Sequence, residues 1–274
     1  MSFYVFKAAA LSPELGIFLT KAVKSSLFDA SRWLGRAAFY FTWEVHILGP
    51  VPRSSAYNSP KFDSVTVNMR GLYLITNDDP LAVLLPKLDA ALAPGAVKIL
   101  QYRRKKVLKA DQPDEVEQIK ALCERHQVPF VINDDLALAA QFGLGVHLGQ
   151  SDGEIRDAAQ GLQPDAIIGR TCENSMQLAE QAIADGATYV AFGAIYATST
   201  KPDAGKIGLE ALRQASAKFD LPICAIGGLT VENSRIVLES GADLCAVISD
   251  ILGKTAEDIP ARVQAWADLF EQTA

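Results

Sequence analysis

The sequence has few of the residues that form metal clusters or nucleophilic triads. It contains three histidines and four cysteines in 274 residues, and no two cysteines form a C-x-x-C pair or another metal-ligand spacing. No combination of Ser, His and Asp, or of Cys and His, indicates covalent catalysis by a side chain. We therefore interpret the cysteines as small buried side chains of a protein in a reducing compartment: Cys123, Cys172, Cys224 and Cys245.

The chain also lacks a long apolar run and an excess of positive charge. No run reaches the roughly 18–20 apolar residues that a membrane-spanning helix needs, and Pro13, Glu14 and Lys21 interrupt the region where a signal peptide would be apolar. The net charge of −6 argues against nucleic-acid binding, which depends on clustered Lys and Arg. We expect a cytoplasmic protein without nucleic-acid or membrane partners, and the sequence leaves a homo-oligomer open.

The composition divides the chain near residue 69. Residues 1–68 have a net charge of +3 and include a linker-like segment, Pro50–Ser55, whereas the remainder has a net charge of −9. A hydrophobic content of 49% suits one large domain with an appendage. We predict an N-terminal extension of uncertain structure over residues 1–68, disordered or loosely helical, and a catalytic domain over residues 69–274.

From Gly71 onward, short apolar or β-branched runs alternate with longer segments of helical period. The predicted strands are Gly71–Thr76, Val97–Gln101, Val128–Ile132, Gly145–Leu148, Ala166–Gly169, Thr188–Phe192, Pro222–Ile226 and Leu244–Ile248, and the helical segments include Asp114–His126, Ser175–Asp185, Val231–Ser240 and Ala256–Glu271. This alternation predicts parallel strands with right-handed crossovers, and the number of units fits a closed (β/α)8 TIM barrel. The alternative is an open doubly wound sheet. That sheet normally has a G-x-G-x-x-G turn after its first strand, and Thr76–Asp79 is not such a turn.

Polar residues follow the predicted strands, at the end of the barrel where active sites lie. After the second strand, Gln101, Arg103 and Lys105 share one face because side chains alternate along an extended segment. Two cations at an inward-facing strand end need an anion, and a phosphate ligand would supply it. The alternative is a solvated charged turn over residues 103–106.

Two carboxylates follow the third and fourth predicted strands. Asp134 and Asp152 come at neighbouring strand ends, so we expect both to face one point above the barrel. Mg²⁺ is bound by one or two carboxylates together with substrate oxygens and water, so this pair predicts a Mg²⁺ site. The alternative is that each aspartate caps the helix that follows it.

The remaining strand ends carry hydroxyls, a lysine and glycines, which are groups that hold phosphates. They are Thr171 after the fifth strand, Thr198, Thr200 and Lys201 after the sixth, Gly228 after the seventh, and Val247, Ile248 and Ser249 at the eighth. Backbone N–H groups after the last two strands of such barrels often bind a phosphate. A polar surface loop is the alternative for Thr198–Lys201. We interpret His147 as a wall or orienting residue rather than a general base.

At these residues the chain resembles the thiamine-phosphate synthases, over roughly residues 69–255. The resemblance rests on motifs in a fixed order: Leu72–Thr76, Gln101-x-Arg103-x-Lys105, Asn133-Asp134, Gly145–Gln150 with Asp152, Thr198-x-Thr200-Lys201-Pro202 and Ile226-Gly227-Gly228. Thr171 stands where this family usually has a serine, so the hydroxyl is retained, whereas the neighbouring Arg170 is unusual.

The resemblance implies a Mg²⁺-dependent transferase. It would condense 4-amino-2-methyl-5-hydroxymethylpyrimidine diphosphate with thiazole phosphate, giving thiamine phosphate and pyrophosphate. Gln101 would contact the pyrimidine, and Asp134 and Asp152 would bind Mg²⁺. The groups assigned to the diphosphate are Asn133 and the four expected to act in catalysis, Arg103, Lys105, Thr171 and Lys201. The groups assigned to the thiazole phosphate are Thr198, Thr200, Gly228, Val247, Ile248 and Ser249.

Three other functions are compatible with a barrel of this kind. A thiazole tautomerase would not need the set of residues for a diphosphate, and a non-catalytic phosphate-binding barrel would be expected to lack a Mg²⁺ carboxylate. A phosphosugar isomerase would need a placed acid–base pair, which the sequence does not indicate. We expect residues 1–68 to be dispensable for catalysis, with Met69 as an alternative start; the rival expectation is amphipathic helices in Phe18–Leu34 that pack on the barrel or a partner.

Overall fold

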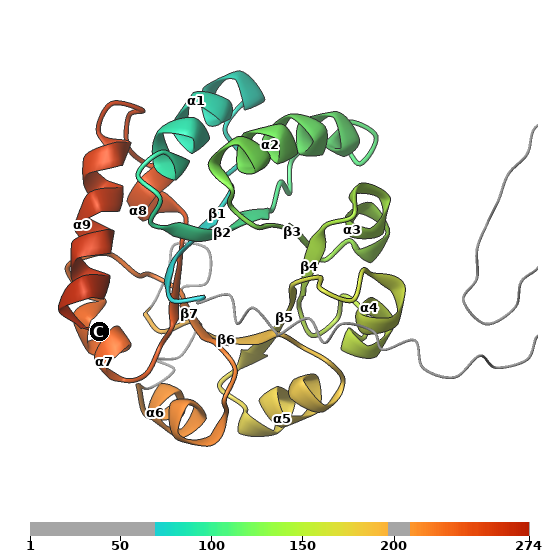
Figure 1. The fold of residues 1–274 in the computed structure, drawn as a ribbon, viewed down its shortest axis with the longest axis vertical. Coiled ribbons are helices and arrows are strands. Elements are labelled where there is room, and N and C mark those ends of the chain that lie inside the picture. Colours follow the sequence, from blue (N-terminus) through green and yellow to red (C-terminus); the bar gives the residue numbers. More distant parts are fainter. Residues whose placement is uncertain (1–68, 197–208, 274) are drawn as a thin grey trace, which may run out of the picture. The chain divides into compact units, whose positions relative to one another are not determined.

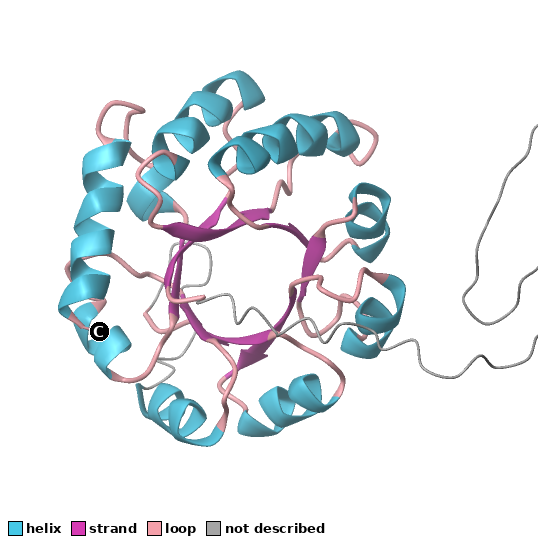
Figure 2. Cartoon of the chain, in the orientation of Figure 1, coloured by secondary structure: helices cyan, strands magenta, loops and turns pink. Residues whose placement is uncertain are grey.

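The computed structural model describes residues 69–196 and 209–273. Eight parallel strands form a closed ring in chain order, and helices surround it (Figures 1 and 2). The strands are β1 Gly71–Ile75, β2 Val97–Tyr102, β3 Phe130–Asn133, β4 Gly145–Leu148, β5 Ile168–Glu173, β6 Tyr189–Gly193, β7 Ile223–Ile226 and β8 Leu244–Val247. The helices are α1 Leu81–Leu92, α2 Gln112–His126, α3 Leu136–Phe142, α4 Ile155–Gly161, α5 Met176–Ala184, α6 Leu209–Lys218, α7 Arg235–Glu239, α8 Ser249–Leu252 and α9 Ile259–Gln272. The predicted (β/α)8 barrel is confirmed.

The strands are short apolar runs because both of their faces are buried. One face packs against the surrounding helices, and the other fills the interior of the ring. The interior is lined by apolar and aromatic side chains that include Tyr73, Ile99, Val131, Tyr189 and Leu244. All strands are parallel, so their carboxyl ends lie at one end of the barrel.

A glycine on β5 makes room for an aromatic ring inside the barrel. A Cβ atom added at Gly169 would lie 2.1–2.4 Å from three ring and hydroxyl atoms of Tyr189. No real side chain tolerates such a distance, so glycine at this position lets the Tyr189 ring lie across the interior. The phenol of Tyr189 is thereby brought to the strands that carry the candidate site.

Two elements differ by four residues at one end from their predicted extents. The fifth strand was expected to end at Gly169, but β5 continues to Glu173, because its pairing with β6 runs on through an irregularity between Thr171 and Glu173. Gly169–Thr171 therefore lie inside the strand. The helix predicted over Val231–Ser240 begins only at Arg235, because a turn closed by the Asn233 side chain precedes it.

Helix α9 closes the barrel against α8 and β1. Trp266 is fully buried, and its indole N–H donates to Asp250 at 2.7 Å. Arg262 donates to both oxygens of the same carboxylate, at 2.9 and 2.5 Å. This carboxylate sits in the first turn of α8, so α9 fixes the start of that helix.

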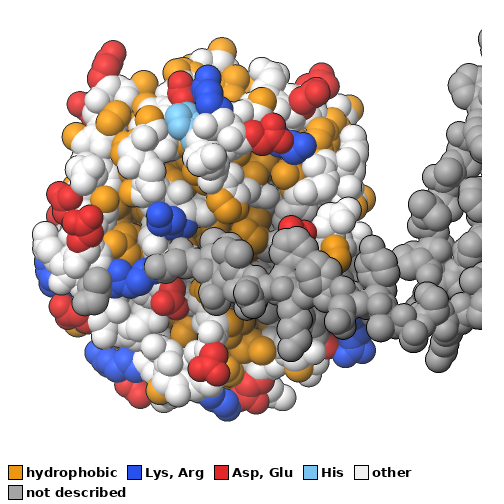
Figure 3. Space-filling model, in the orientation of Figure 1, with side chains coloured by type: hydrophobic (Ala, Val, Ile, Leu, Met, Phe, Trp, Pro, Cys, Tyr) orange, Lys and Arg blue, Asp and Glu red, His pale blue; other side chains and the backbone are white. Residues whose placement is uncertain are grey.

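Surface and core features bear on the predictions made from composition. All four cysteines are buried and unpaired, as expected. Among the described residues, no helix is long and apolar enough to cross a membrane. Figure 3 shows acidic and basic side chains interspersed around one face of the barrel.

Candidate active site

Four consecutive cations, residues 103–106, follow β2, and the structure separates the roles of the first three. Arg104 is buried and binds Glu115 of α2 through two nitrogens, at 3.0 and 2.9 Å, and also donates to the carbonyl oxygens of Asn77 and Asp79. Arg103 is half-buried and Lys105 is exposed. Within the described part of the chain, the side chains of these two form no hydrogen bond or ion pair. Arg104 therefore serves the fold, and the assignment of its neighbours Arg103 and Lys105 to a ligand stays a prediction.

Asp134 and Asp152 converge on Gly149. A Cβ atom added at Gly149 would lie 2.4 Å from Oδ2 of Asp152 and 3.7 Å from Oδ1 of Asp134. The N–H of Gly149 donates to the same oxygen of Asp134 at 3.2 Å. The glycine therefore leaves open one small space that an oxygen of each carboxylate borders. That the pair binds Mg²⁺ stays a prediction.

Neither aspartate caps a helix. The N-cap of α3 is Asp135, whose side chain accepts the N–H of Leu138 at 3.0 Å, and the N-cap of α4 is Glu154. The capping alternative is therefore wrong for Asp134 and Asp152. Asp134 instead has a φ of 63°, a left-handed conformation that Asp and Asn tolerate better than most residues.

The surroundings of Asp134 alter its protonation. Burial raises the pKa of its carboxyl above the usual value, and the nearby Asp152 carboxylate adds to the rise. The N–H of Gly149, the side-chain amide of Asn133 at 2.5 Å and the charge of Lys105 act in the opposite direction. Two carboxylates that repel each other in a partly buried space favour the binding of a cation.

The turn that carries Asp152 is held by a buried arginine. Arg170 points away from the barrel interior, and its guanidinium donates to the carbonyl oxygens of Gly153 at 2.6 Å and Gln150 at 3.5 Å. The side-chain amide of Gln150 in turn donates to the carbonyl oxygen of Thr171. The arginine that is unusual for the resemblance thus braces the turn next to the two carboxylates.

A chain of hydrogen bonds crosses the barrel interior from Gln101 to Thr171. Nε2 of Gln101 donates to the hydroxyl of Tyr73 at 2.9 Å, and this hydroxyl lies 2.7 Å from that of Tyr189. The Tyr189 hydroxyl lies 2.7 Å from Nδ1 of His147, whose Nε2 lies 2.9 Å from Oγ1 of Thr171. Burial lowers the pKa of His147 to about 4, and nearby Arg170 adds to this effect. His147 is therefore neutral near pH 7, which suits an orienting residue.

Sequence reasoning missed Tyr73 and Tyr189. Both lie within apolar strands, where a tyrosine is as easily interpreted as a core residue. A signal was present in their positions: each points inward on its strand, and a buried phenol needs a hydrogen-bond partner. Their chain joins two residues, Gln101 and Thr171, that the sequence singled out for separate reasons.

The ends of β7 and β8 lie across the ring from those of β3 and β4. Gly227 and Gly228 both have positive φ, 109° and 66°, and the side chain of Asn233 donates to the carbonyl oxygen of Gly228. Val247 ends β8, half-buried Ile248 follows it, and exposed Ser249 begins α8. The predicted site residues thus form two groups on opposite sides of the barrel opening.

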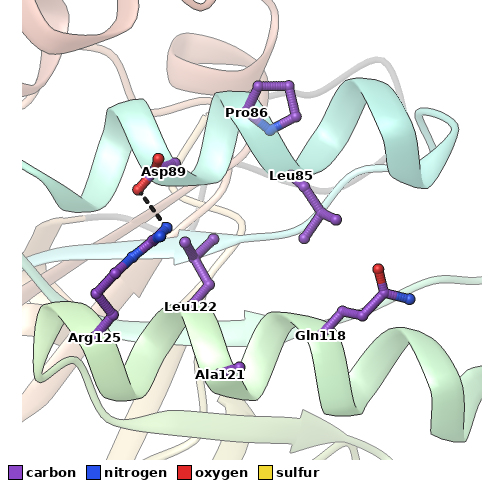
Figure 4. Close-up of a pocket in the computed structure, with 7 residues that line it drawn as sticks. All are labelled: Leu85, Pro86, Asp89, Gln118, Ala121, Leu122 and Arg125. Atoms are coloured by element: carbon purple, nitrogen blue, oxygen red, sulfur yellow. Dashed lines mark hydrogen bonds and ion pairs between the residues drawn. The ribbon is translucent and has the colours of Figure 1, made fainter.

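Part of the predicted site lies outside the described residues. Thr198, Thr200 and Lys201 belong to the segment 197–208, which the structure does not describe. A surface depression between α1 and α2 is lined by none of the predicted site residues (Figure 4). Within residues 69–196 and 209–273, no group of three or more His, Cys, Asp or Glu side chains is placed to hold a metal ion.

Known proteins similar to this chain share its barrel. A thiamine phosphate pyrophosphorylase from Pyrococcus furiosus has 30% sequence identity and a TM-score of 0.66, and the match covers 76% of this chain and 98% of that one. A thiamine phosphate pyrophosphorylase from Bacteroides thetaiotaomicron has 17% identity and a TM-score of 0.55, over 73% of this chain and 98% of that one. At 13% identity and a TM-score of 0.54, a (S)-3-O-geranylgeranylglyceryl phosphate synthase from Thermoplasma acidophilum shares the fold over 74% of this chain and 93% of its own.

The family comparison covers most of the barrel. The sequence model of the thiamine monophosphate synthase family matches residues 72–251, from β1 into α8. This span includes each of the motifs on which the resemblance was based. The chain therefore belongs to the thiamine monophosphate synthase family, a family of transferases in thiamine biosynthesis.

Proposed function

We propose that this chain condenses 4-amino-2-methyl-5-hydroxymethylpyrimidine diphosphate with thiazole phosphate to give thiamine phosphate and pyrophosphate. The observation that carries the proposal is the group of charges beside β2–β4. Two carboxylates border the space at Gly149, and two cations whose side chains have no partner among the described residues, Arg103 and Lys105, follow β2. A diphosphate with a bound divalent cation matches both charge types at once.

Mg²⁺ fits the donors that are present. Asp134 and Asp152 are hard oxygen ligands, and Mg²⁺ commonly takes one or two carboxylates while keeping water and substrate phosphate oxygens. The small number of protein ligands supports a cation that arrives with the diphosphate rather than one held in a closed protein cage. When bound, the cation would neutralise charge that develops on the leaving pyrophosphate.

The protein groups around this space would assist departure of the diphosphate. Arg103, Lys105 and Asn133 would bind its oxygens, and Thr171 would donate a hydroxyl hydrogen bond from β5, the strand next to β4. Gln101, at the start of the interior hydrogen-bond chain, would orient the pyrimidine ring. Positioning and charge stabilisation are sufficient for this reaction, because the thiazole nitrogen is itself the nucleophile.

The second group of residues would hold the thiazole phosphate. Gly228 and Ser249 lie across the opening, and the residues before and within the first turn of α8 offer backbone N–H groups. Thr198, Thr200 and Lys201 are assigned to the site by the resemblance alone. Two subsites on opposite sides of one opening suit a reaction that joins two phosphorylated molecules.

One assay of thiamine phosphate formation, run with and without each substrate, tests the proposal. Purified protein, both substrates and Mg²⁺ should yield thiamine phosphate, and omission of either substrate should abolish the product. Conversion of a thiazole tautomer without the pyrimidine diphosphate would instead favour a tautomerase. Binding of both phosphorylated substrates without any product would favour a non-catalytic barrel.

The two subsites should be separable by substitution. Lys105→Ala should weaken the binding of inorganic pyrophosphate with Mg²⁺, and Ser249→Ala should weaken the binding of thiazole phosphate. A lost charge-assisted phosphate contact costs about 1.5–3 kcal/mol, or roughly ten- to a hundred-fold, and the serine hydroxyl should cost less. Calorimetric titration of each ligand into each variant measures the effect. If both variants weaken both ligands equally, the assignment of two subsites is wrong.

Arg170 should matter to the metal without touching it. Arg170→Met removes the donors that hold the Gln150–Gly153 turn, so Asp152 should lose its fixed position. Loss of a residue that orients a metal ligand typically weakens affinity about ten- to a hundred-fold. We expect this loss in Mg²⁺ titrations with pyrophosphate present. Arg156→Met is the matched control, because Arg156 pairs with Asp185 at the surface. An equal effect of both substitutions would refute the bracing role.

A further inference from the structure

The hydrogen-bond chain inside the barrel has a direction. Its members are Gln101, Tyr73, Tyr189, His147 and Thr171, and each neighbouring pair is joined by one contact of 2.7–2.9 Å. Both tyrosines are buried, and burial raises their pKa, so each phenol carries one proton. The neutral imidazole also carries one proton. Each contact holds a single hydrogen, so the choice made at one contact sets all the others.

Only two arrangements of hydrogens fill every contact without leaving a buried phenol hydrogen that has no acceptor. In the first, the hydrogens run from Gln101 toward Thr171: Gln101 donates to Tyr73, the tyrosines donate onward, and His147 carries its proton on Nε2. The outer ends are then Oε1 of Gln101, an acceptor, with the second N–H of the same amide beside it, and the free O–H of Thr171, a donor. In the second, every contact is reversed, so Gln101 presents its N–H₂ group outward and Thr171 presents lone pairs.

We propose that this chain is a specificity device: it couples the hydrogen-bond polarity of Gln101 to that of Thr171, so that the site selects a ring bearing an amino group joined to an anionic phosphate. The proposal rests on the function proposed above. Tyr73, Tyr189 and His147 are positioning residues, since they are buried and act through the two end residues.

The contact between Gln101 and Tyr73 favours the first arrangement. Nε2 of Gln101 is the atom that faces Tyr73, and no partner of its Oε1 is recorded among the described residues. Gln101 as a whole is 2% exposed, and no buried side-chain nitrogen or oxygen in this part of the chain lacks a partner. Thr171 is half-buried at the other end, and its hydroxyl is free to donate once His147 donates to it.

The coupling explains why two ends are more selective than one. An amino group on the ring requires an acceptor at Gln101, and a phosphate oxygen requires a donor at Thr171, so both groups favour the first arrangement. A ring with an oxo group in place of the amino group requires a donor at Gln101. Reversing the chain to provide it would turn the lone pairs of Thr171 toward the phosphate. Such a ligand can pair with both ends only if its oxo group shifts from Oε1 of Gln101 to the second N–H of the same amide.

The first test measures where His147 carries its proton. Nitrogen-15 NMR of the histidine rings, with inorganic pyrophosphate and Mg²⁺ added, should show the Nε2–H form of the neutral imidazole. The chain has three histidines, so a His147→Gln variant identifies the signal. In Tyr189→Phe the partner of Nδ1 is lost, and the two neutral forms should mix. A predominant Nδ1–H form in the wild-type protein with pyrophosphate bound would overturn the proposal.

The second test measures selectivity. We compare the dissociation constants of the aminopyrimidine diphosphate and its oxo analogue by calorimetry with Mg²⁺. Tyr189→Phe and Tyr73→Phe each break the chain without removing an end residue. In both, the preference for the amino ligand should fall about ten-fold, because an uncoupled end can adapt to the oxo group. Tyr102→Phe is the matched control: its hydroxyl binds Glu115 outside the barrel, and the preference should not change.

The outcomes separate this inference from the function on which it rests. If thiamine phosphate forms but the selectivity of both chain-breaking variants stays within two-fold of the wild type, the coupling is wrong and the function stands. If no thiamine phosphate forms and neither pyrimidine diphosphate binds, the function is wrong. The NMR measurement with pyrophosphate then still decides the direction of the chain. A loss of preference as large in Tyr102→Phe would reduce the role of the chain to general packing.

Discussion

Asp134→Asn and Asp152→Asn should each lose most of the turnover of thiamine phosphate while the barrel stays folded. Asparagine preserves the size of the side chain and tolerates the left-handed backbone at residue 134, where φ is 63°. It removes the negative charge that attracts a divalent cation. Metal stabilisation of a leaving group is worth several kcal/mol, so kcat/KM should fall about 100-fold or more.

The mechanism of the loss is distinguishable from misfolding. Raising the Mg²⁺ concentration should restore part of the activity, since a weakened site fills at higher concentration. Asp135→Ala is the matched control, because the Asp135 carboxylate caps α3 and is not one of the proposed Mg²⁺ ligands. It should lower stability by about 1 kcal/mol and leave Mg²⁺ dependence unchanged. Normal turnover in both Asp134→Asn and Asp152→Asn would show that these carboxylates do not hold a catalytic metal.

The parts of the site that could be predicted from sequence depend on regular geometry. Strand ends gather at one edge of a parallel barrel, and side chains alternate along an extended segment. Those two rules sufficed to place Asp134 beside Asp152 and to separate Arg103 and Lys105 from Arg104. They needed no knowledge of individual rotamers, because the topology alone brings the residues together.

The parts that could not be predicted depend on single contacts. Which aspartate caps α3 follows from the backbone of Asp134, whose left-handed turn shifts the cap to Asp135. The interior hydrogen-bond chain requires Gly169 to leave room for the Tyr189 ring. The strand pattern identifies both residues as part of an apolar strand. It does not show that the missing side chain of Gly169 on β5 leaves room for the phenol of Tyr189 on β6.

Arg104→Met should destabilise the protein more than Arg103→Met or Lys105→Ala in the same turn. The guanidinium of Arg104 and the carboxylate of Glu115 are 3% and 12% exposed, so removing the cation leaves a nearly buried anion without its partner. The carbonyl oxygens of Asn77 and Asp79 lose their donor as well. Breaking a buried pair from one side typically costs about 3–5 kcal/mol. For a domain of this size the melting temperature should fall by roughly 10 °C.

Arg103→Met supplies the opposite result at the adjacent position. The Arg103 guanidinium has no hydrogen bond or ion pair among the described residues, so its loss should change the free energy of unfolding by less than about 1 kcal/mol. The affinity of the Arg103→Met variant for pyrophosphate with Mg²⁺ should fall about ten-fold or more, because a charge-assisted contact is lost. Arg104→Met, measured well below its melting temperature, should retain pyrophosphate affinity within about three-fold. Denaturant unfolding and calorimetry on the two variants give both quantities. If Arg104→Met loses affinity as Arg103→Met does, or unfolds at the wild-type midpoint, the division of this turn into a structural Arg104 and a ligand-binding Arg103 is wrong.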